Sequence, residues 1–381
     1  MINEHSTLNE ILDASMTPER LERMKKLTHM DLPEGTPEVV NDYLIKQWGR
    51  QVNITYARFV AGIKVKPDDV DYCMKGAIDI HAHGGSDPFG RLLLEDEICE
   101  DYIKAGMAGV VLKTWYTPSA SRNQLVKKLV DQWAAQQPVP PQPFHLFGGI
   151  TLNKTVGGLN PIAVEKCLGF PGFKYVWLPM VDSYHHQQVV NDNYAPDAGI
   201  RLLDENGKVK GELKDIMRIC ADHDLVLASG HYGYEDSFPV MEEARKLGVK
   251  HCELIHPTHI HSKHTIKQMK EYADMGVKVM LCALGFTCFP IHEEGPIYAA
   301  KIIDEVGEDN LVFGTDYGQV HNPRHVVGVR WAAQLLLSYG VKKETIRKIF
   351  AINTAKHLDI EPAVTLDEPL EKTPVQQTVI L

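Results

Sequence analysis

Several kinds of protein are excluded by what this sequence lacks. Its 381 residues include seven cysteines, an odd number without a CxxC pair, so we expect free thiols in a reducing, cytoplasmic compartment. Basic residues are too few for general nucleic-acid binding, because 40 of them stand against 50 acidic ones and the net charge is −10. The sequence contains no apolar run of about 18 residues and therefore predicts no membrane span. The first residues, MINEHSTLNEILDAS, lack the pattern of a secretion signal.

Short catalytic motifs are also missing. There is no P-loop, no GxSxG elbow and no HExxH motif, and no GxGxxG turn follows the first expected strand. Histidine, in contrast, is abundant, with 18 residues. Chance and surface histidines are one explanation and a metal site is the other, so the positions of the histidines have to decide between them.

From residue 73 onward, short apolar runs alternate with helical stretches. This alternation is typical of a parallel sheet covered by helices, and eight such units favour closure into a (β/α)8 TIM-type barrel. An open, doubly wound sheet is the alternative. Gly106, Gly248 and Gly276 each follow a helical stretch, where a left-handed residue commonly ends a helix. The expected strands are 76–82, 109–115, 144–152, 174–182, 225–231, 252–258, 278–284 and 311–317.

We divide the chain into three segments. Residues 1–72 carry apolar residues at helical spacing and predict a helical N-terminal extension. Residues 73–360 form the expected barrel, and residues 361–381 are a C-terminal tail. Within the barrel, residues 183–210 are polar and follow the fourth strand, so we expect a loop or small hairpin able to cover a site.

The strongest local signal is the sequence AIDIHAH, in which His81 and His83 lie two residues apart at the end of the first strand. Residues i and i+2 of a strand point to the same face, so both imidazoles are expected to point into the barrel mouth. Two inward histidines are unfavourable unless they pair or bind a ligand. For this motif alone, a hydrogen-bonded structural pair is an equal alternative.

Three other strand ends change that balance. His231 ends LASGH, His256 lies in ELIHP and Asp316 lies in FGTDYG. Barrel enzymes build their active sites at the C-terminal ends of the strands. Imidazole nitrogens with a carboxylate oxygen make a shell for zinc or another divalent metal. We expect Zn2+, with Mn2+ and Fe2+ as alternatives, and one or two ions per chain.

An HxH on strand one, single histidines on strands five and six and an aspartate on strand eight together resemble the amidohydrolase superfamily. The resemblance covers about residues 76–358. The motifs DIHAH, VVLKTW, GGITLNKTVGGLNP, LASGH, IHP and TDYGQVHNP are similar to a branch of mostly uncharacterised amidohydrolase-like proteins. The resemblance implies a barrel fold and metal dependence, whereas it points to no particular substrate.

The function implied by this resemblance is metal-dependent hydrolysis of a C–N bond in an amide, cyclic amide or related small molecule. His81 and His83 hold one cation close to Asp316, while His231 and His256 hold a second cation or complete the first shell and contact the substrate. Asp316 is the expected general base, and His231 or His256 helps the metal to stabilise the oxyanion. Ester or lactone cleavage, and a lyase reaction such as decarboxylation or hydration of a small carboxylic acid, stay open.

One feature departs from the superfamily pattern. Binuclear members usually bridge their metals with a carboxylated lysine or a glutamate near strand four, but that strand ends here in PMVDSY. The inward lysine is Lys113, on strand two. A buried lysine must shift its pKa, form an ion pair or be modified. Two interpretations of Lys113 are equally favoured. In the first, Lys113 forms a metal-bridging carbamate or has a direct polar role. In the second, it forms an ion pair with Asp316 or Asp79.

Four further residues are candidates for substrate binding, at positions in loops that follow strands: Tyr116, Lys154, His259 and His321. A cation at Lys154 could hold a substrate carboxylate, and a surface lysine before a turn is the equal alternative. The extra N-terminal helices also lead us to expect a homo-oligomer.

Overall fold

A computed structural model describes residues 58, 61–62, 64–138, 143–190, 198–288 and 295–367. Eight strands form one sheet in the order of the chain, and each adjacent pair is parallel. The strands are β1 (Ile78–His83), β2 (Gly109–Lys113), β3 (His145–Thr151), β4 (Phe173–Trp177), β5 (Val226–Ala228), β6 (His251–Leu254), β7 (Lys278–Cys282) and β8 (Leu311–Gly314).

The first and last strands meet, so the sheet closes. The backbone N–H of His83 donates to the carbonyl oxygen of Tyr317 at 2.8 Å, and that of Asp316 donates to the carbonyl oxygen of His81 at 2.7 Å. Ala82 also forms a parallel bridge with Tyr317. These contacts confirm the (β/α)8 barrel and exclude the open, doubly wound sheet.

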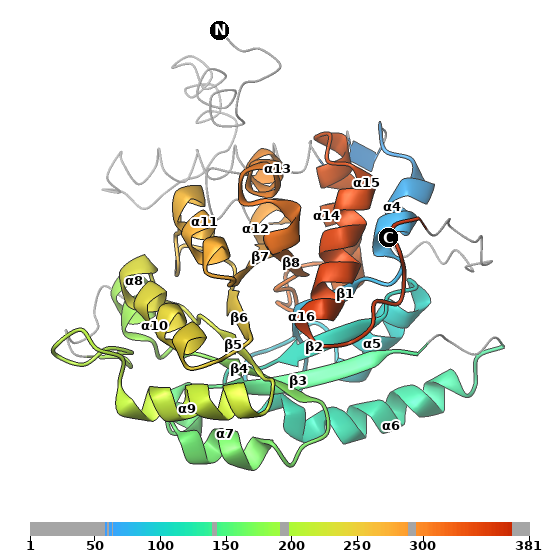
Figure 1. Ribbon diagram of the computed structural model, residues 1–381. Coiled ribbons are helices and arrows are strands. Elements are labelled where there is room, and N and C mark those ends of the chain that lie inside the picture. The colour runs from blue at the N-terminus through green and yellow to red at the C-terminus, as the bar shows by residue number, and fades with distance from the viewer. Residues whose placement is uncertain are drawn as a thin grey trace, which may run out of the picture.

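Helices surround the strands (Figure 1). Their amphipathic spacing explains why they pack there: α9 buries Leu213, Ile216, Met217 and Cys220, which share one helical face. The helices are α4 (Pro67–Met74), α5 (Glu95–Lys104), α6 (Asn123–Ala134), α7 (Pro161–Cys167), α8 (Tyr184–Val190), α9 (Gly211–Asp222), α10 (Tyr234–Lys246), α11 (Ile266–Asp274), α12 (Leu284–Thr287), α13 (Gly295–Val306), α14 (His325–Ser338), α15 (Lys343–Arg347) and α16 (Thr354–His357).

All eight expected strands are present, although most of them end earlier than predicted. Several polar residues at the predicted strand ends, such as His231, belong to the loops that leave the barrel. The three helix-ending glycines are confirmed, because Gly106, Gly248 and Gly276 have φ values of 77°, 90° and 81°. Only glycine adopts this left-handed conformation without strain.

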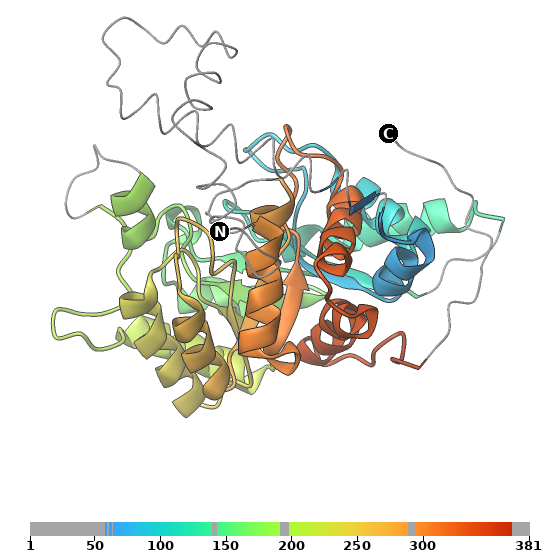
Figure 2. The ribbon, with the colours of Figure 1, turned by 90° about the horizontal axis from the view of Figure 1, so that it is seen from above.

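Segments from the two ends of the barrel sequence pack together. Helix α4 lies beside α14 and α15 in both ribbon views (Figure 1, Figure 2). The Lys343 ammonium lies 2.8 Å from Asp69, and the Arg330 guanidinium lies 2.8 Å from Asp71. Most of the predicted extension 1–72 and most of the predicted tail 361–381 lie outside the described residues.

Two further expectations can be compared with the structure. All seven cysteines lie in the described ranges, and they are buried and form no disulfide. None of the helices in the described part of the chain is both long and apolar enough to cross a membrane.

The segment 183–210 differs in part from the predicted loop or hairpin. It begins with helix α8, which starts where the Ser183 hydroxyl accepts a hydrogen bond from the backbone N–H of His186. An antiparallel bridge between Leu203 and Val209 then forms the expected small hairpin. The helix escaped prediction because its seven residues carry little apolar periodicity.

Candidate metal centre

The ends of four strands bring five buried polar side chains together inside the barrel mouth. His81 and His83 lie on β1 and Lys113 on β2, while His256 follows β6 and Asp316 follows β8. Between 0% and 8% of each residue is exposed. We call these five residues the strand-end cluster. Bulk water cannot supply hydrogen bonds to these buried polar atoms, so the atoms must bond to one another or to a ligand.

The side chains of the cluster converge on the Asp316 carboxylate. Its Oδ1 lies 3.1 Å from Nε2 of His83 and 3.4 Å from Nε2 of His81. The Lys113 amine lies 3.0 Å from the same His81 nitrogen. Candidate ligand atoms of His81, His256 and Asp316 all lie within 4.8 Å of one another. Imidazoles from different strands therefore face one carboxylate.

Asp79 positions Asp316 without joining the cluster. Its carboxylate accepts hydrogen bonds from the backbone N–H groups of His81 at 3.0 Å and Thr315 at 2.8 Å, and from the hydroxyls of Thr315 and Tyr102. These bonds tie β1 to the end of β8. Asp79 therefore acts on the loop that carries Asp316, whereas the Lys113 amine lies 3.0 Å from Nε2 of His81.

Two members of the cluster have a strained backbone. His256 has a φ of 24° and Asp316 a φ of 57°, in the region that non-glycine residues rarely adopt. Such strain persists only where the surrounding structure enforces it, and it gathers at functional sites. The backbone thus aims both side chains at the barrel mouth.

Burial sets the charges of the cluster. Burial is the main reason that the pKa values of His81, His83 and His256 lie well below the ordinary value, so all three imidazoles are neutral. Burial lowers the pKa of Lys113 to about 7 and raises that of Asp316 to about 6, and in each case the opposite charge of the other residue resists the shift. At neutral pH, Asp316 is ionised and Lys113 is divided between its two forms.

This donor set fits a divalent cation. Neutral imidazoles offer lone pairs, and here two Nε2 atoms face a carboxylate oxygen that also offers only lone pairs. A cation between them would satisfy all three atoms. Three or four nitrogen and oxygen ligands of this kind match zinc and related ions. His81, His83, His256 and Asp316 are the residues that would hold it.

Cation affinity should fall steeply as the solution is acidified. As pH falls through about 7, Lys113 gains a proton and its ammonium repels the cation, and as pH falls through about 6, Asp316 loses its negative charge. Each proton that competes with the cation weakens the affinity for the cation by about tenfold per pH unit. Competition with a chelator between pH 5 and pH 8 measures the slope.

The Lys113→Met variant provides the comparison for this titration. It lacks the ammonium, so its affinity should depend on one proton rather than two, and below about pH 6 its slope should be about half that of the unchanged protein. Equal slopes in the two proteins would show that Lys113 does not face the cation.

His231, expected at this centre, lies at its edge. Its ring centroid is 4.9 Å from that of His256, but its Nδ1 faces Nδ1 of His186 at 2.8 Å. His231 follows the end of β5 by three residues, so the alternation of strand side chains no longer determines its direction. Its role as a metal ligand or catalytic residue stays a prediction.

Two residues near Asp316 extend the cluster. His259, expected to bind substrate, places Nε2 3.8 Å from Oδ2 of Asp316 and 3.8 Å from Sγ of Cys282. Cys282, one of the seven expected free thiols, ends β7, and burial raises its thiol pKa well above the ordinary value. Its position at a strand end is the same signal that identified the other residues.

The other three candidates for substrate binding lie further out. Tyr116 is half-buried, with its ring centroid 6.4 Å from that of Trp115. Lys154 and His321 are exposed. The backbone N–H of Lys154 donates to Asp182, while its side chain reaches solvent. Substrate binding by these three residues stays a prediction.

The fold and the strand-end cluster together define a class of protein, the TIM-type barrels with a candidate cation site at the C-terminal ends of their strands. Within that class, residues 76–280 match the model of a family of unknown function, DUF6282. The match spans more than half of the chain, which therefore belongs to this family. No curated protein matches the chain in sequence.

Several solved structures are similar to the chain. An amidohydrolase from Pseudomonas aeruginosa is 15% identical, with a TM-score of 0.47 over 77% of this chain and 98% of that one. An N-acetyl-D-glucosamine-6-phosphate deacetylase from Mycobacterium smegmatis is 14% identical, with a TM-score of 0.43 over 75% and 76%. A 2,6-dihydroxybenzoate decarboxylase from Rhizobium is 12% identical, with a TM-score of 0.43 over 75% and 99%.

Proposed function

We propose that the protein is a metal-dependent hydrolase that cleaves a C–N bond, in an amide, cyclic amide or related small molecule. The observation that carries this proposal is the convergence of the His81 and His83 nitrogens on Asp316, at 3.4 Å and 3.1 Å, in a buried site at the strand ends. Neutral imidazoles around one carboxylate suit a cation together with a base.

A divalent cation bound by the cluster would lower the pKa of water and polarise a carbonyl group. Asp316 accepts a proton from the attacking water and later passes it to the nitrogen that leaves. Its pKa of about 6 suits this exchange, because the group is ionised at neutral pH and remains basic enough to take the proton. The His259 ring lies near this carboxylate, with Nε2 3.8 Å from Oδ2.

Lys113 enters the proposal in two possible forms that one measurement separates. A pKa of about 7 leaves much of its amine neutral at neutral pH, and a neutral amine can add CO2 to give a carbamate and a proton. Carbon-13 NMR of protein supplied with labelled bicarbonate would reveal a carbamate signal that is absent from Lys113→Met. Without that signal, Lys113 carries an unmodified amine with a polar role beside His81.

The test of the function combines metal analysis with product analysis. Protein produced with zinc or manganese and bicarbonate is analysed for bound metal and is then incubated with amides, cyclic amides, lactones and small aromatic acids. A new carboxylate together with a new amine supports the proposal. Bound metal with release of CO2 instead identifies a lyase, and a folded protein that binds no metal contradicts the central claim.

A further inference from the structure

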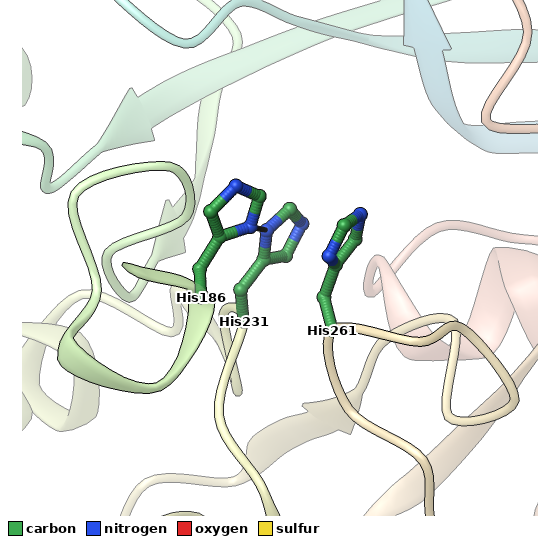
Figure 3. Close-up of side chains that lie close together, drawn as sticks. All are labelled: His186, His231 and His261. Atoms are coloured by element: carbon green, nitrogen blue, oxygen red, sulfur yellow. Dashed lines mark hydrogen bonds between the residues drawn. The ribbon is translucent and has the colours of Figure 1, made fainter. Parts of the chain in front are cut away.

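A second group of imidazoles lies beside the strand-end cluster. His186, His231 and His261 lie side by side with their rings facing one another (Figure 3). Their ring centroids are 4.4 to 5.0 Å apart, and candidate ligand atoms of all three lie within 4.8 Å of one another. We call these residues the histidine triad. Only His231 was expected at a metal site from the sequence.

The triad is assembled from three separate parts of the chain. His186 lies on α8, which follows β4, while His231 follows β5 and His261 lies in the loop after β6. Buried Ser183 joins two of these parts, because its hydroxyl donates to the carbonyl oxygen of His231 at 2.7 Å and accepts from the backbone N–H of His186 at 3.0 Å. The backbone therefore holds His186 and His231 in place before any ligand arrives.

The chemistry of the triad suits a transition metal better than a structural histidine pair. Nδ1 of His186 and Nδ1 of His231 are 2.8 Å apart, so one of them carries a proton in the structure. The ring centroid of His261, the third imidazole, lies 4.4 Å from that of His186 and 4.7 Å from that of His231. Two nitrogens bound to one zinc ion at about 2.0–2.1 Å would be separated by roughly 3.3 Å, so a small opening of the pair is enough.

Binding needs only a change of tautomer and a turn of the rings. The proton on one Nδ1 moves to Nε2 of the same ring, which leaves both Nδ1 lone pairs available to the ion without changing the net charge of either histidine. The rings stack at 15° to 31° to one another, and rotation about the soft ring torsion turns their lone pairs to a common point.

We propose that His186, His231 and His261 bind a zinc-type transition-metal ion at a site separate from the strand-end cluster. Three imidazoles with a water in the fourth position are a complete ligand set for such an ion. Because His186 belongs to α8, the ion fastens this helix to the loops after β5 and β6. The proposal does not depend on the proposed hydrolase activity, and a measurement of metal binding alone tests it.

Titration with Co2+ tests the site directly, because cobalt held by imidazoles absorbs visible light. Metal-free full-length protein is titrated, and bound Co2+ per chain is counted by elemental analysis after removal of excess ion. We expect His186→Gln and His261→Gln each to bind one equivalent of Co2+ less than the unchanged protein. Each variant should also lose the visible absorption that this ion contributes. His185→Gln is the matched control, because His185 is the next residue on α8 and its ring lies against Gly233.

The His81→Ala variant separates this proposal from the proposed function. His81→Ala should still bind the equivalent of Co2+ that His186→Gln loses. The His81→Ala, His186→Gln double variant should bind neither the ion of the triad nor the ion of the strand-end cluster. A loss in His186→Gln with no loss in His81→Ala would support the triad and contradict the strand-end centre. Undiminished binding in both His186→Gln and His261→Gln, or no binding in the unchanged protein, would overturn the triad site, with circular dichroism confirming that each variant folds.

Discussion

Replacing His81 by alanine is expected to remove the cation at the strand ends and to lower turnover at least ~1,000-fold. The Nε2 atom of His81 lies 3.4 Å from Asp316 and 3.0 Å from the Lys113 amine, so its loss removes one ligand and leaves the amine without this contact. Elemental analysis should show one equivalent of metal less than in the unchanged protein. Kinetics should show the loss of turnover on the substrate found among the amides, cyclic amides, lactones and small aromatic acids.

The control for this variant is His357→Ala. His357 is also buried, but its ring contacts Glu253 of β6, at 3.2 Å, and not Asp316. Its removal creates a comparable cavity, and it should change stability while leaving metal content intact. Full metal content and full turnover in His81→Ala would remove this residue from the centre.

Asp316→Asn is expected to bind the cation more weakly, to keep it at the metal concentrations supplied during production, and to lose turnover by about 100- to 10,000-fold. The imidazoles remain as ligands, whereas the amide cannot accept the proton from the attacking water, and general-base catalysis contributes a factor of about this size. The substitution keeps the shape of the side chain in a residue whose backbone is strained, at φ 57°. Turnover at saturating substrate and metal content are measured on the same sample.

Asp215→Asn is the control for the charge change. Asp215 lies on α9 with 60% of its side chain exposed, next to Arg218, and it should have no effect on either quantity. An Asp316→Asn variant with ordinary turnover would contradict the assignment of the general base. A variant that loses the cation completely would show instead that Asp316 acts mainly as a ligand.

The barrel could be predicted because its signals are local and repeated. Each strand is an apolar run between amphipathic helices, and strand ends must gather at one mouth once the sheet closes. His81 and His83 could be placed there because both lie within β1, where alternation determines which face a side chain takes. The positions of these two histidines therefore follow from a simple periodic rule.

The histidine triad could not be predicted by that rule. His231 is separated from β5 by Ser229 and by Gly230, whose φ is 68°, so a turn and not a strand sets its direction. Its partner His186 lies on a short helix within a segment that reads as polar loop. Contacts between loops depend on tertiary packing, which a single sequence does not reveal.

The contact between β1 and the end of β8 also determines when the proposed cation can first find its ligands together. Asp79 and Thr315, whose contact positions Asp316, are 236 residues apart in the chain. At a synthesis rate of about 5–20 residues per second, at least about ten seconds separate the appearance of these two residues. Free His81 and His83 must wait during that time without their carboxylate. The proposed cation would therefore find its full set of ligands only after β8 has paired with β1 and the barrel has closed.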